Sequence, residues 1–244
     1  MEHCEILNGT GWKFYYDDTL FPPGTDSFLL SSFPRLKPGL RVCDLGAGTG
    51  LLELLLLRRQ RELQVTGLEF HPGAVALAEK NITENGLSAA LSVQCGDLRR
   101  REVLPGAGAF DLVVCNPPYF SAGSGGSAGG TARRTAREEI SCTLENVCSA
   151  AAYLLHWGGS FCLVHRPERL ADLITALRTA GLEPKRLRPA VQRAGQPPIL
   201  LLLESRRGGR PGLAWEMPLC LTDADGRATR ELDAIYYRNG KDMP

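Results

Sequence analysis

The amino-acid sequence predicts an α/β fold built on a mostly parallel sheet with helices on both faces. Three observations favour this class. Short aliphatic and β-branched runs alternate with longer segments of helical periodicity, a glycine-rich turn follows the first run, and acidic residues stand at the ends of the next two. Together they indicate a Rossmann-like, doubly wound sheet. With 244 residues and 43% hydrophobic content, the chain can bury one such core with extensions at both ends.

Seven strands and four helices are expected, largely in alternation. The expected strands are residues 41–45, 64–69, 91–95, 110–115, 160–165, 182–188 and 199–205. Each is a short apolar run bounded by turn residues. The expected helices are residues 51–60, 72–85, 144–155 and 168–180. Pro72 suits a first helical turn, and Gly86, Gly158 and Gly181 are placed to end the second, third and fourth helices.

Two segments fall outside this alternation. Residues 121–130 contain five glycines and no large side chain, which predicts a mobile loop. Beyond residue 206 the chain is rich in Gly and Pro and then predicts a hairpin around Asp223–Gly226. This DADG lacks the ligand spacing and the distal glutamate of a calcium loop, so we interpret it as a turn.

Charge, cysteines and hydropathy limit the class of protein further. The formal net charge of +1 argues against a protein that coats nucleic acid. Eight cysteines form no CxxC pair, and residues 1–18 lack the apolar core of a signal peptide, so free thiols in a reducing compartment are expected. No apolar run is long enough to span a bilayer, and the four histidines stand far apart. We therefore expect a soluble, cytoplasmic monomer with no metal and no membrane contact.

The glycine-rich turn has the sequence DLGAGTG at residues 44–50. Gly46, Gly48 and Gly50 let the backbone turn tightly and approach a ligand without a Cβ in the way. In the dinucleotide fingerprint G-x-G-x-x-G the third glycine comes one residue later. Asp44 would repel a pyrophosphate but can orient an ammonium group. The turn thus favours S-adenosylmethionine, with a nucleotide-binding relative as the alternative.

Two carboxylates follow the next two expected strands. Glu69 ends the second strand and can accept hydrogen bonds from both hydroxyls of a ribose. Asp97, followed by Leu98, comes after the third strand and is placed to accept from the adenine amine of the cofactor. An Asp after a strand is more often a cap or turn residue. Their positions at successive strand ends favour a cofactor site.

The sequence Asn116-Pro117-Pro118-Tyr119 follows the fourth expected strand. If the Asn116 side-chain oxygen and the Pro117 carbonyl oxygen accept the two hydrogens of a planar amine, its nitrogen can pyramidalise and attack a methyl carbon. The prolines hold these acceptors in place, and Tyr119 offers a face for stacking. A stiffened turn with a capping Asn is the structural alternative. Adenine, cytosine and a glutamine amide all present such an amine.

Several motifs resemble those of class I methyltransferases that modify amino groups. The glycine-rich turn, the strand FDLVVC at 110–115 and NPPYF at 116–120 carry the resemblance. Gly24-Thr25-Asp26, HRPERL at 165–170, residues 133–139 and RELDAIY at 230–236 make the chain similar to the bacterial tRNA-valine adenine-N6-methyltransferases, which act on the adenine 3′ of the anticodon. The resemblance implies a seven-stranded class I sheet, S-adenosylmethionine as cofactor and tRNA as partner. Where family members often have His, this chain has Glu138-Glu139.

The expected site follows from these motifs. Cofactor contacts are expected at Asp44, Gly46, Gly48, Gly50, Glu69, Asp97, Leu98 and Asn116. Catalysis is expected at Asn116, Pro117, Pro118 and Tyr119, and substrate contacts at Tyr119, Phe120, Arg133, Arg134 and Arg137. The domains are then residues 1–35, an extension contributing to the site; residues 36–205, the methyltransferase domain; and residues 206–244, a hairpin and tail.

The identity of the acceptor is the open question at this stage. Four basic clusters lie at residues 99–101, 133–137, 185–193 and 206–210, and several are expected on loops that border the site, which favours RNA. A solvated, arginine-rich surface is the alternative for each cluster. A glutamine N5-methyltransferase acting on a release factor is the alternative enzyme, although it normally carries a helical N-terminal domain and only about forty residues precede the glycine turn here. A catalytically inactive RNA-binding module is the alternative from another class.

Overall fold

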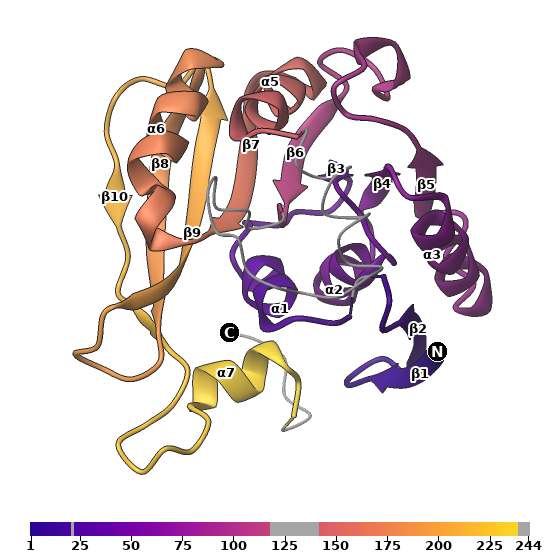
Figure 1. Cartoon of the computed structure of the whole chain (residues 1–244), viewed down its shortest axis with the longest axis horizontal. Helices are drawn as coiled ribbons and strands as arrows, with labels where there is room; N and C mark the ends of the chain where they lie inside the picture. Colours follow the sequence, from indigo (N-terminus) through magenta and orange to yellow (C-terminus); the bar gives the residue numbers. More distant parts are fainter. Residues whose placement is uncertain (21, 118–141, 239–244) are drawn as a thin grey trace.

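A computed structural model of the chain describes residues 1–20, 22–117 and 142–238. Its centre is one large sheet (Figure 1). The strands of this sheet are β3 (Arg41–Leu45), β4 (Gln64–Glu69), β5 (Leu91–Cys95), β6 (Phe110–Cys115), β7 (Leu155–His165), β8 (Leu182–Val191), β9 (Pro198–Arg207), β10 (Ala214–Trp215) and β11 (Leu219–Cys220). They lie in the order β10-β8-β9-β7-β6-β3-β4-β5, with β11 paired to β8.

The pairing is parallel except at β9. β3 pairs in parallel with β4 and β6, β4 with β5, and β6 with β7. β9 runs antiparallel between β7 and β8. All seven expected strands are present, so the prediction of a mostly parallel sheet is confirmed. The sequence did not predict β10 and β11, which pair with β8, because two residues are too few to show a period.

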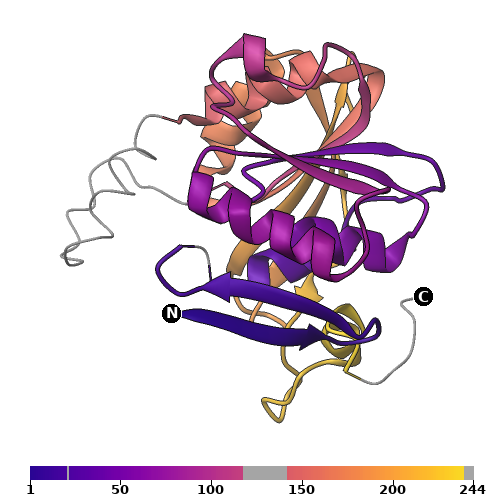
Figure 2. The ribbon, with the colours of Figure 1, turned by 90° about the vertical axis from the view of Figure 1, so that its right-hand side faces the viewer.

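Helices cover both faces of the sheet. They are α1 (Thr25–Ser32), α2 (Leu51–Arg59), α3 (Pro72–Glu84), α5 (Leu144–Leu154), α6 (Leu170–Thr179) and α7 (Arg230–Ile235), with short 3-10 helices at Arg101–Val103 and Pro167–Arg169. In Figure 2, α5 and α6 lie on one side of the sheet and α2 and α3 on the other. The four expected helices are confirmed. No helix of the described residues is long and apolar enough to cross a membrane.

The core consists of two layers separated by the sheet. Val42 and Val114 contribute to the layer beneath α1 and α2, whereas their neighbours Cys43 and Val113 contribute to the layer beneath α5 and α6. Such alternation buries both faces, as parallel strands covered by helices require. α2 is buried along eight of its nine residues, because α1 covers the side that the sheet leaves open. This explains its nearly continuous leucine sequence.

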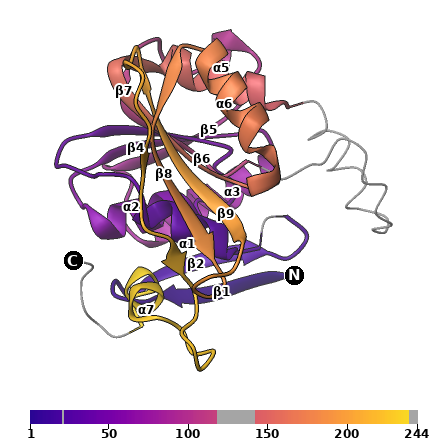
Figure 3. The ribbon, with the colours of Figure 1, turned by 90° about the vertical axis from the view of Figure 1, so that its left-hand side faces the viewer.

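The N-terminal residues form a hairpin that the sequence did not predict. β1 (Glu2–Leu7) and β2 (Trp12–Asp17) pair antiparallel and lie on the α3 side of the molecule (Figure 3). Asn81 of α3 connects this hairpin to the glycine turn. Its Oδ1 accepts from Tyr15 N at 2.7 Å, and its Nδ2 donates to Thr49 O at 2.8 Å. The hairpin thus supports the turn from behind.

The C-terminal residues pack back onto α1. The Tyr236 ring, directly after α7, stacks on Phe28 at 4.2 Å, and its hydroxyl donates to Thr25 Oγ1 at 3.2 Å. The turn expected around Asp223 is confirmed, since Asp223 Oδ1 accepts from the backbone N–H groups of Asp225 and Arg227. Residues at the C-terminal end of the described chain therefore position α1.

Arg186 of β8 anchors the C-terminal segment. Its side chain is 12% exposed, pairs with Glu204 of β9 at 2.8 Å and Glu216 at 2.9 Å, and donates to Phe33 O at 2.6 Å. Arg188 likewise pairs with Glu231 at 2.7 Å. These two arginines were expected in a basic cluster facing RNA, but they hold the protein's own carboxylates.

Arg186→Ala tests this anchor. Removing the guanidinium leaves the Glu204 carboxylate buried without its cation, which we expect to lower the free energy of unfolding by roughly 3 kcal/mol. Urea unfolding measures the loss. Arg227→Ala is the control, since Arg227 and its partner Asp225 are 81% and 72% exposed, and it should cause no measurable change. Equal losses in the two variants would contradict the assignment.

Candidate active site

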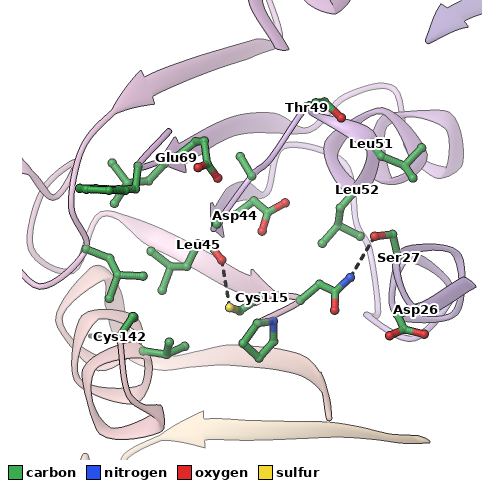
Figure 4. A pocket seen from close by; sticks show the side chains of 18 of the residues that line it. Asp26, Ser27, Asp44, Leu45, Thr49, Leu51, Leu52, Glu69, Cys115 and Cys142 are labelled. Carbon is green, nitrogen blue, oxygen red and sulfur yellow. Dashed lines mark hydrogen bonds between the residues drawn. The ribbon is translucent and has the colours of Figure 1, made fainter. Parts of the chain in front are cut away.

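A cavity of about 380 Å³ opens at the carboxyl ends of β3, β4 and β6. This edge is where open α/β sheets bind ligands. Its wall is formed by the glycine turn and the start of α2, the end of β4, the segments after β5 and β6, and residues at the starts of α1 and α5, among them Cys142 and Val147. Figure 4 shows Asp44, Glu69, Ser27 and Asp26 around the cavity.

The glycine turn has the backbone shape that its sequence predicts. Gly46, Gly48 and Gly50 all have positive φ, at +85°, +55° and +89°. Residues that carry a side chain rarely adopt such positive φ angles, so the backbone needs glycine at these positions. A Cβ at Gly46 would meet nothing within 4 Å, so the requirement there is conformational rather than steric.

Glu69 ties the turn to the end of β4. Its Oε2 accepts from Gly48 N at 2.8 Å, and its Oε1 accepts from His71 N at 2.7 Å. The side chain is 5% exposed and lines the cavity. A carboxylate has about four acceptor positions, so two hydrogen bonds leave capacity for the hydroxyls of a ligand. Phe70, next in the chain, is 49% exposed and lines the same cavity, which offers an aromatic surface beside that carboxylate.

Asp97 and Leu98 line the cavity on the side of α5. The Asp97 carboxylate pairs with Arg99, whose Nε lies 2.8 Å from Oδ1 and 2.9 Å from Oδ2. Hydrogen bonding to Arg99 lowers the pKa of Asp97, which keeps it ionised. Asp97 therefore remains an acceptor, and a ligand amine would share it with Arg99. One member of the basic cluster expected at residues 99–101 is thus committed to the cavity wall.

Asn116 and Pro117 lie at the cavity directly after β6. Asn116 Nδ2 donates to Ser27 Oγ of α1 at 3.1 Å, the contact dashed in Figure 4. Because an amide group is planar, directing its nitrogen toward α1 directs its oxygen away from that contact. Ser27 thereby sets the orientation of the side chain that the motif predicts to accept an amine hydrogen.

Asp44 and Glu53 form a buried acidic pair behind the turn. Burial raises the pKa of Asp44 well above its usual value, and the neighbouring Glu53 and Glu69 carboxyl groups raise it further. Burial also raises the pKa of Glu53 to about 7. Asp44 lines the cavity, and Glu53 of α2 lies behind it.

The expected site residues divide into three groups. Asp44, Gly46, Glu69, Asp97, Leu98, Asn116 and Pro117 line the one cavity. Gly48 and Gly50 are not among the residues that line the cavity; their positive φ angles set the backbone path of the turn, and their contact with the cofactor stays a prediction. Pro118, Tyr119, Phe120, Arg133, Arg134, Arg137, Glu138, Glu139 and the loop 121–130 lie outside the described residues.

Sequence reasoning missed Phe70, Ser27, Asp26, Cys142 and Glu53. The sequence did indicate Phe70 as a possible binding residue, because a large aromatic residue directly after a strand-end carboxylate is available to a ligand. It also indicated Glu53, as the only charged residue in the run of residues 51–57. Nothing in the sequence indicated a role for Ser27, since its partner Asn116 is 89 residues away. Groups of three or more potential metal ligands are absent from the described residues.

The sheet order, the single antiparallel strand β9 and the cavity beside the glycine turn define the class I methyltransferase fold. A predicted O-methyltransferase from Agrobacterium tumefaciens has this fold, with a TM-score of 0.72 and 23% identity, covering 90% of this chain and 98% of that one. Geranyl diphosphate C-methyltransferase from Streptomyces coelicolor, solved with S-adenosyl-L-homocysteine, matches with a TM-score of 0.54 and 12% identity over 74% of this chain and 75% of that one.

The chain belongs to the methyltransferase small domain family, whose model matches residues 21–171. Among its relatives is the tRNA1(Val) (adenine(37)-N6)-methyltransferase of Tolumonas auensis, 33% identical over 87% of this chain and 86% of the relative. The enzyme of the same name from Porphyromonas gingivalis is 34% identical over 67% of this chain and 66% of the relative. The family resemblance predicted from the motifs is confirmed.

Ser27→Ala tests the orienting contact. Without the Ser27 hydroxyl the Asn116 amide loses a contact that orients it, so we expect kcat for methyl transfer to fall about tenfold, the scale of one hydrogen bond, with cofactor affinity unchanged. Ser27→Thr keeps the hydroxyl and should retain most of the activity.

Ser32→Ala is the matched control. Ser32 lies on the same helix, but its hydroxyl donates to Leu29 O, and it should leave kcat unchanged. If Ser27→Ala and Ser32→Ala behave alike, the orienting role is wrong.

Proposed function

We propose that this protein transfers the methyl group of S-adenosylmethionine to the N6 amine of an adenine in tRNA. The observation that carries the proposal is the convergence of Glu69, Asp44 and the Asn116-Pro117 segment on one cavity at the edge of a class I methyltransferase sheet. The names of the relatives supply the acceptor: adenine 37 of tRNA1(Val).

The residues of the cavity fit this cofactor. A volume of about 380 Å³ lies in the usual range for a small-molecule site. Glu69 would accept from the ribose hydroxyls, Phe70 would lie against the adenine ring, and Asp97 would accept from its amine. Asp44 Oδ1 is buried without a hydrogen-bond partner, which suits a site that receives a positively charged ligand. S-adenosylmethionine supplies a methyl group made electrophilic by its sulfonium.

Asn116 and Pro117 would prepare the acceptor amine. The lone pair of an adenine N6 is delocalised into the ring, so the nitrogen is a weak nucleophile. The Asn116 Oδ1 and the Pro117 carbonyl oxygen would each accept one amine hydrogen, and the nitrogen then pyramidalises. Both acceptors follow β6 directly, and Ser27 holds the amide, so little reorganisation is needed during reaction. The proton leaves after methylation, when the nitrogen is positively charged and acidic.

The acceptor class follows from the relatives rather than from the motif. A glutamine amide presents a similar amine, but relatives that cover most of this chain carry the name of a tRNA enzyme. An unpaired base in a tRNA loop is less costly to extrude than a base in a duplex, which suits an enzyme of this size. Part of the expected basic surface, around Arg186 and Arg188, is committed to internal ion pairs, so other arginines would contact the RNA.

Methylation of a valine tRNA transcript tests the proposal. With S-adenosylmethionine, nucleoside mass spectrometry should detect N6-methyladenosine, and a transcript with guanosine at position 37 should remain unmodified. N5-methylglutamine on a release factor, with no change in tRNA, would overturn the proposed acceptor. Binding of tRNA without any product would support an inactive module.

Asn116→Ala tests the role of the amide. Losing one preorganised acceptor should lower turnover by roughly a hundredfold while leaving cofactor affinity nearly intact. Gln196→Ala removes an exposed amide between β8 and β9, outside the residues that line the cavity, and serves as the control. Turnover of Asn116→Ala within a few-fold of wild type would contradict the assignment.

A further inference from the structure

The pair Asp44–Glu53 has features that the proposed chemistry does not use. Asp44 ends β3 and Glu53 lies on α2, and each is only 1% exposed. Asp44 Oδ1 and Glu53 Oε2 are buried without a hydrogen-bond partner. The glycine at position 67 makes room for the pair, because a Cβ there would lie 2.5 Å from Glu53 Oε1. Among the described residues, no ion pair joins either of these two buried carboxyl groups to a cation.

The described groups that face the pair do not supply a positive charge. Glu69 of β4 is another carboxylate, and it raises the pKa of both Asp44 and Glu53. Cys43 of β3 and Cys115 of β6 are buried thiols whose pKa values are raised well above the usual value, so they stay neutral. Two ionised carboxylates in such surroundings would repel each other at a large cost. A proton on one of the two groups removes this repulsion, and it also supplies a donor, since ionised carboxylates only accept.

We propose that Asp44 and Glu53 share one proton in the ligand-free protein and release it to solvent when the positively charged cofactor binds beside the glycine turn. This inference rests on the proposed function, because it takes S-adenosylmethionine as the ligand. Glu53 does not line the cavity and acts through Asp44, so it is a positioning residue. The ionised Asp44 then faces the cofactor, with the ionised Glu53 behind it. Because a proton leaves as the positively charged ligand binds, the net charge of the site changes by less than the charge of the ligand.

The pH dependence of cofactor affinity follows from the number of protons bound before and after the cofactor binds. The unliganded pair binds more protons than the complex, so raising the pH favours the complex. Burial raises the pKa of Glu53 to about 7 and also raises the pKa of Asp44, so the change in cofactor affinity falls in the neutral pH range. We expect cofactor affinity to rise with pH from about pH 6 to about pH 8, by at most about tenfold per unit for one proton.

The pair's contribution to the stability of the ligand-free protein falls as the pH rises, whereas cofactor affinity increases. A carboxyl group whose pKa is raised by folding stabilises the fold most below its unfolded pKa, and this contribution is lost as the pH rises through the folded value. The Tm of the ligand-free protein should therefore fall less between about pH 5 and pH 8 in Glu53→Gln than in wild type.

Isothermal titration calorimetry of the full chain with S-adenosylmethionine measures the proton directly. Titrations at one pH, about pH 6.5, in two buffers of different ionisation enthalpy give the number of protons released, and we expect about half a proton or more per cofactor. Glu53→Gln should release almost none and should lose the pH dependence of affinity. Glu79→Gln makes the same change at an exposed position of α3 and should behave like wild type.

The outcomes separate this inference from the proposed function. Cofactor binding with no proton release by wild type would overturn the shared proton and leave the proposed function intact. Equal release by wild type and Glu53→Gln would overturn the role of Glu53. No binding in either buffer would overturn the proposed cofactor and this inference together. Should Glu53→Gln fail to fold, the wild-type titration in two buffers still decides the matter.

Discussion

The hydrogen bond from Gly48 N–H to the Glu69 carboxylate is the interaction on which the site depends. It joins the turn after β3 to the end of β4, so that two adjacent strands share one rigid edge. The positive φ angles of the turn make this contact possible, since they bring the Gly48 N–H toward β4. The same turn ends at Gly50, where α2 begins. The position of α2, of Glu53 and of the cavity wall all follow from this contact.

Segments distant in sequence complete the site. α1 carries Ser27 to Asn116, and it is held from outside by Tyr236 stacked on Phe28. Arg186 adds a second attachment at Phe33, just after α1, by stacking over its ring at 4.0 Å. Arg58 joins the two ends of the chain, because it donates to Asn8 O and to Ile235 O. The sheet thus provides the cofactor edge, the C-terminal segment positions the helix that orients the amide, and the N-terminal hairpin supports the glycine turn.

The fold was predictable where a local pattern sufficed. The bounds of β3, β4, β5 and β6 match the expected ranges, because each is a short apolar run between turn residues. Asp44, Glu69 and Asn116 were found because parallel strands end at one edge. α1 has eight residues with little amphipathic pattern, so it was not expected. The N-terminal hairpin was missed although Asn8-Gly9 between its strands is a turn signal, because β1 is mostly exposed and lacks an apolar run. Arg186 was misinterpreted because charge clustering in sequence does not reveal which acids lie opposite.

A crystal structure of the protein with S-adenosylhomocysteine tests the central claim most directly. The account predicts the ribose hydroxyls within hydrogen-bonding distance of the Glu69 carboxylate, with the sulfur facing Asn116 and Pro117. If the sulfur lay at the opposite edge of the sheet, or if the ribose lay beyond the reach of Glu69, the glycine turn and the amide would belong to different sites and the account would be wrong.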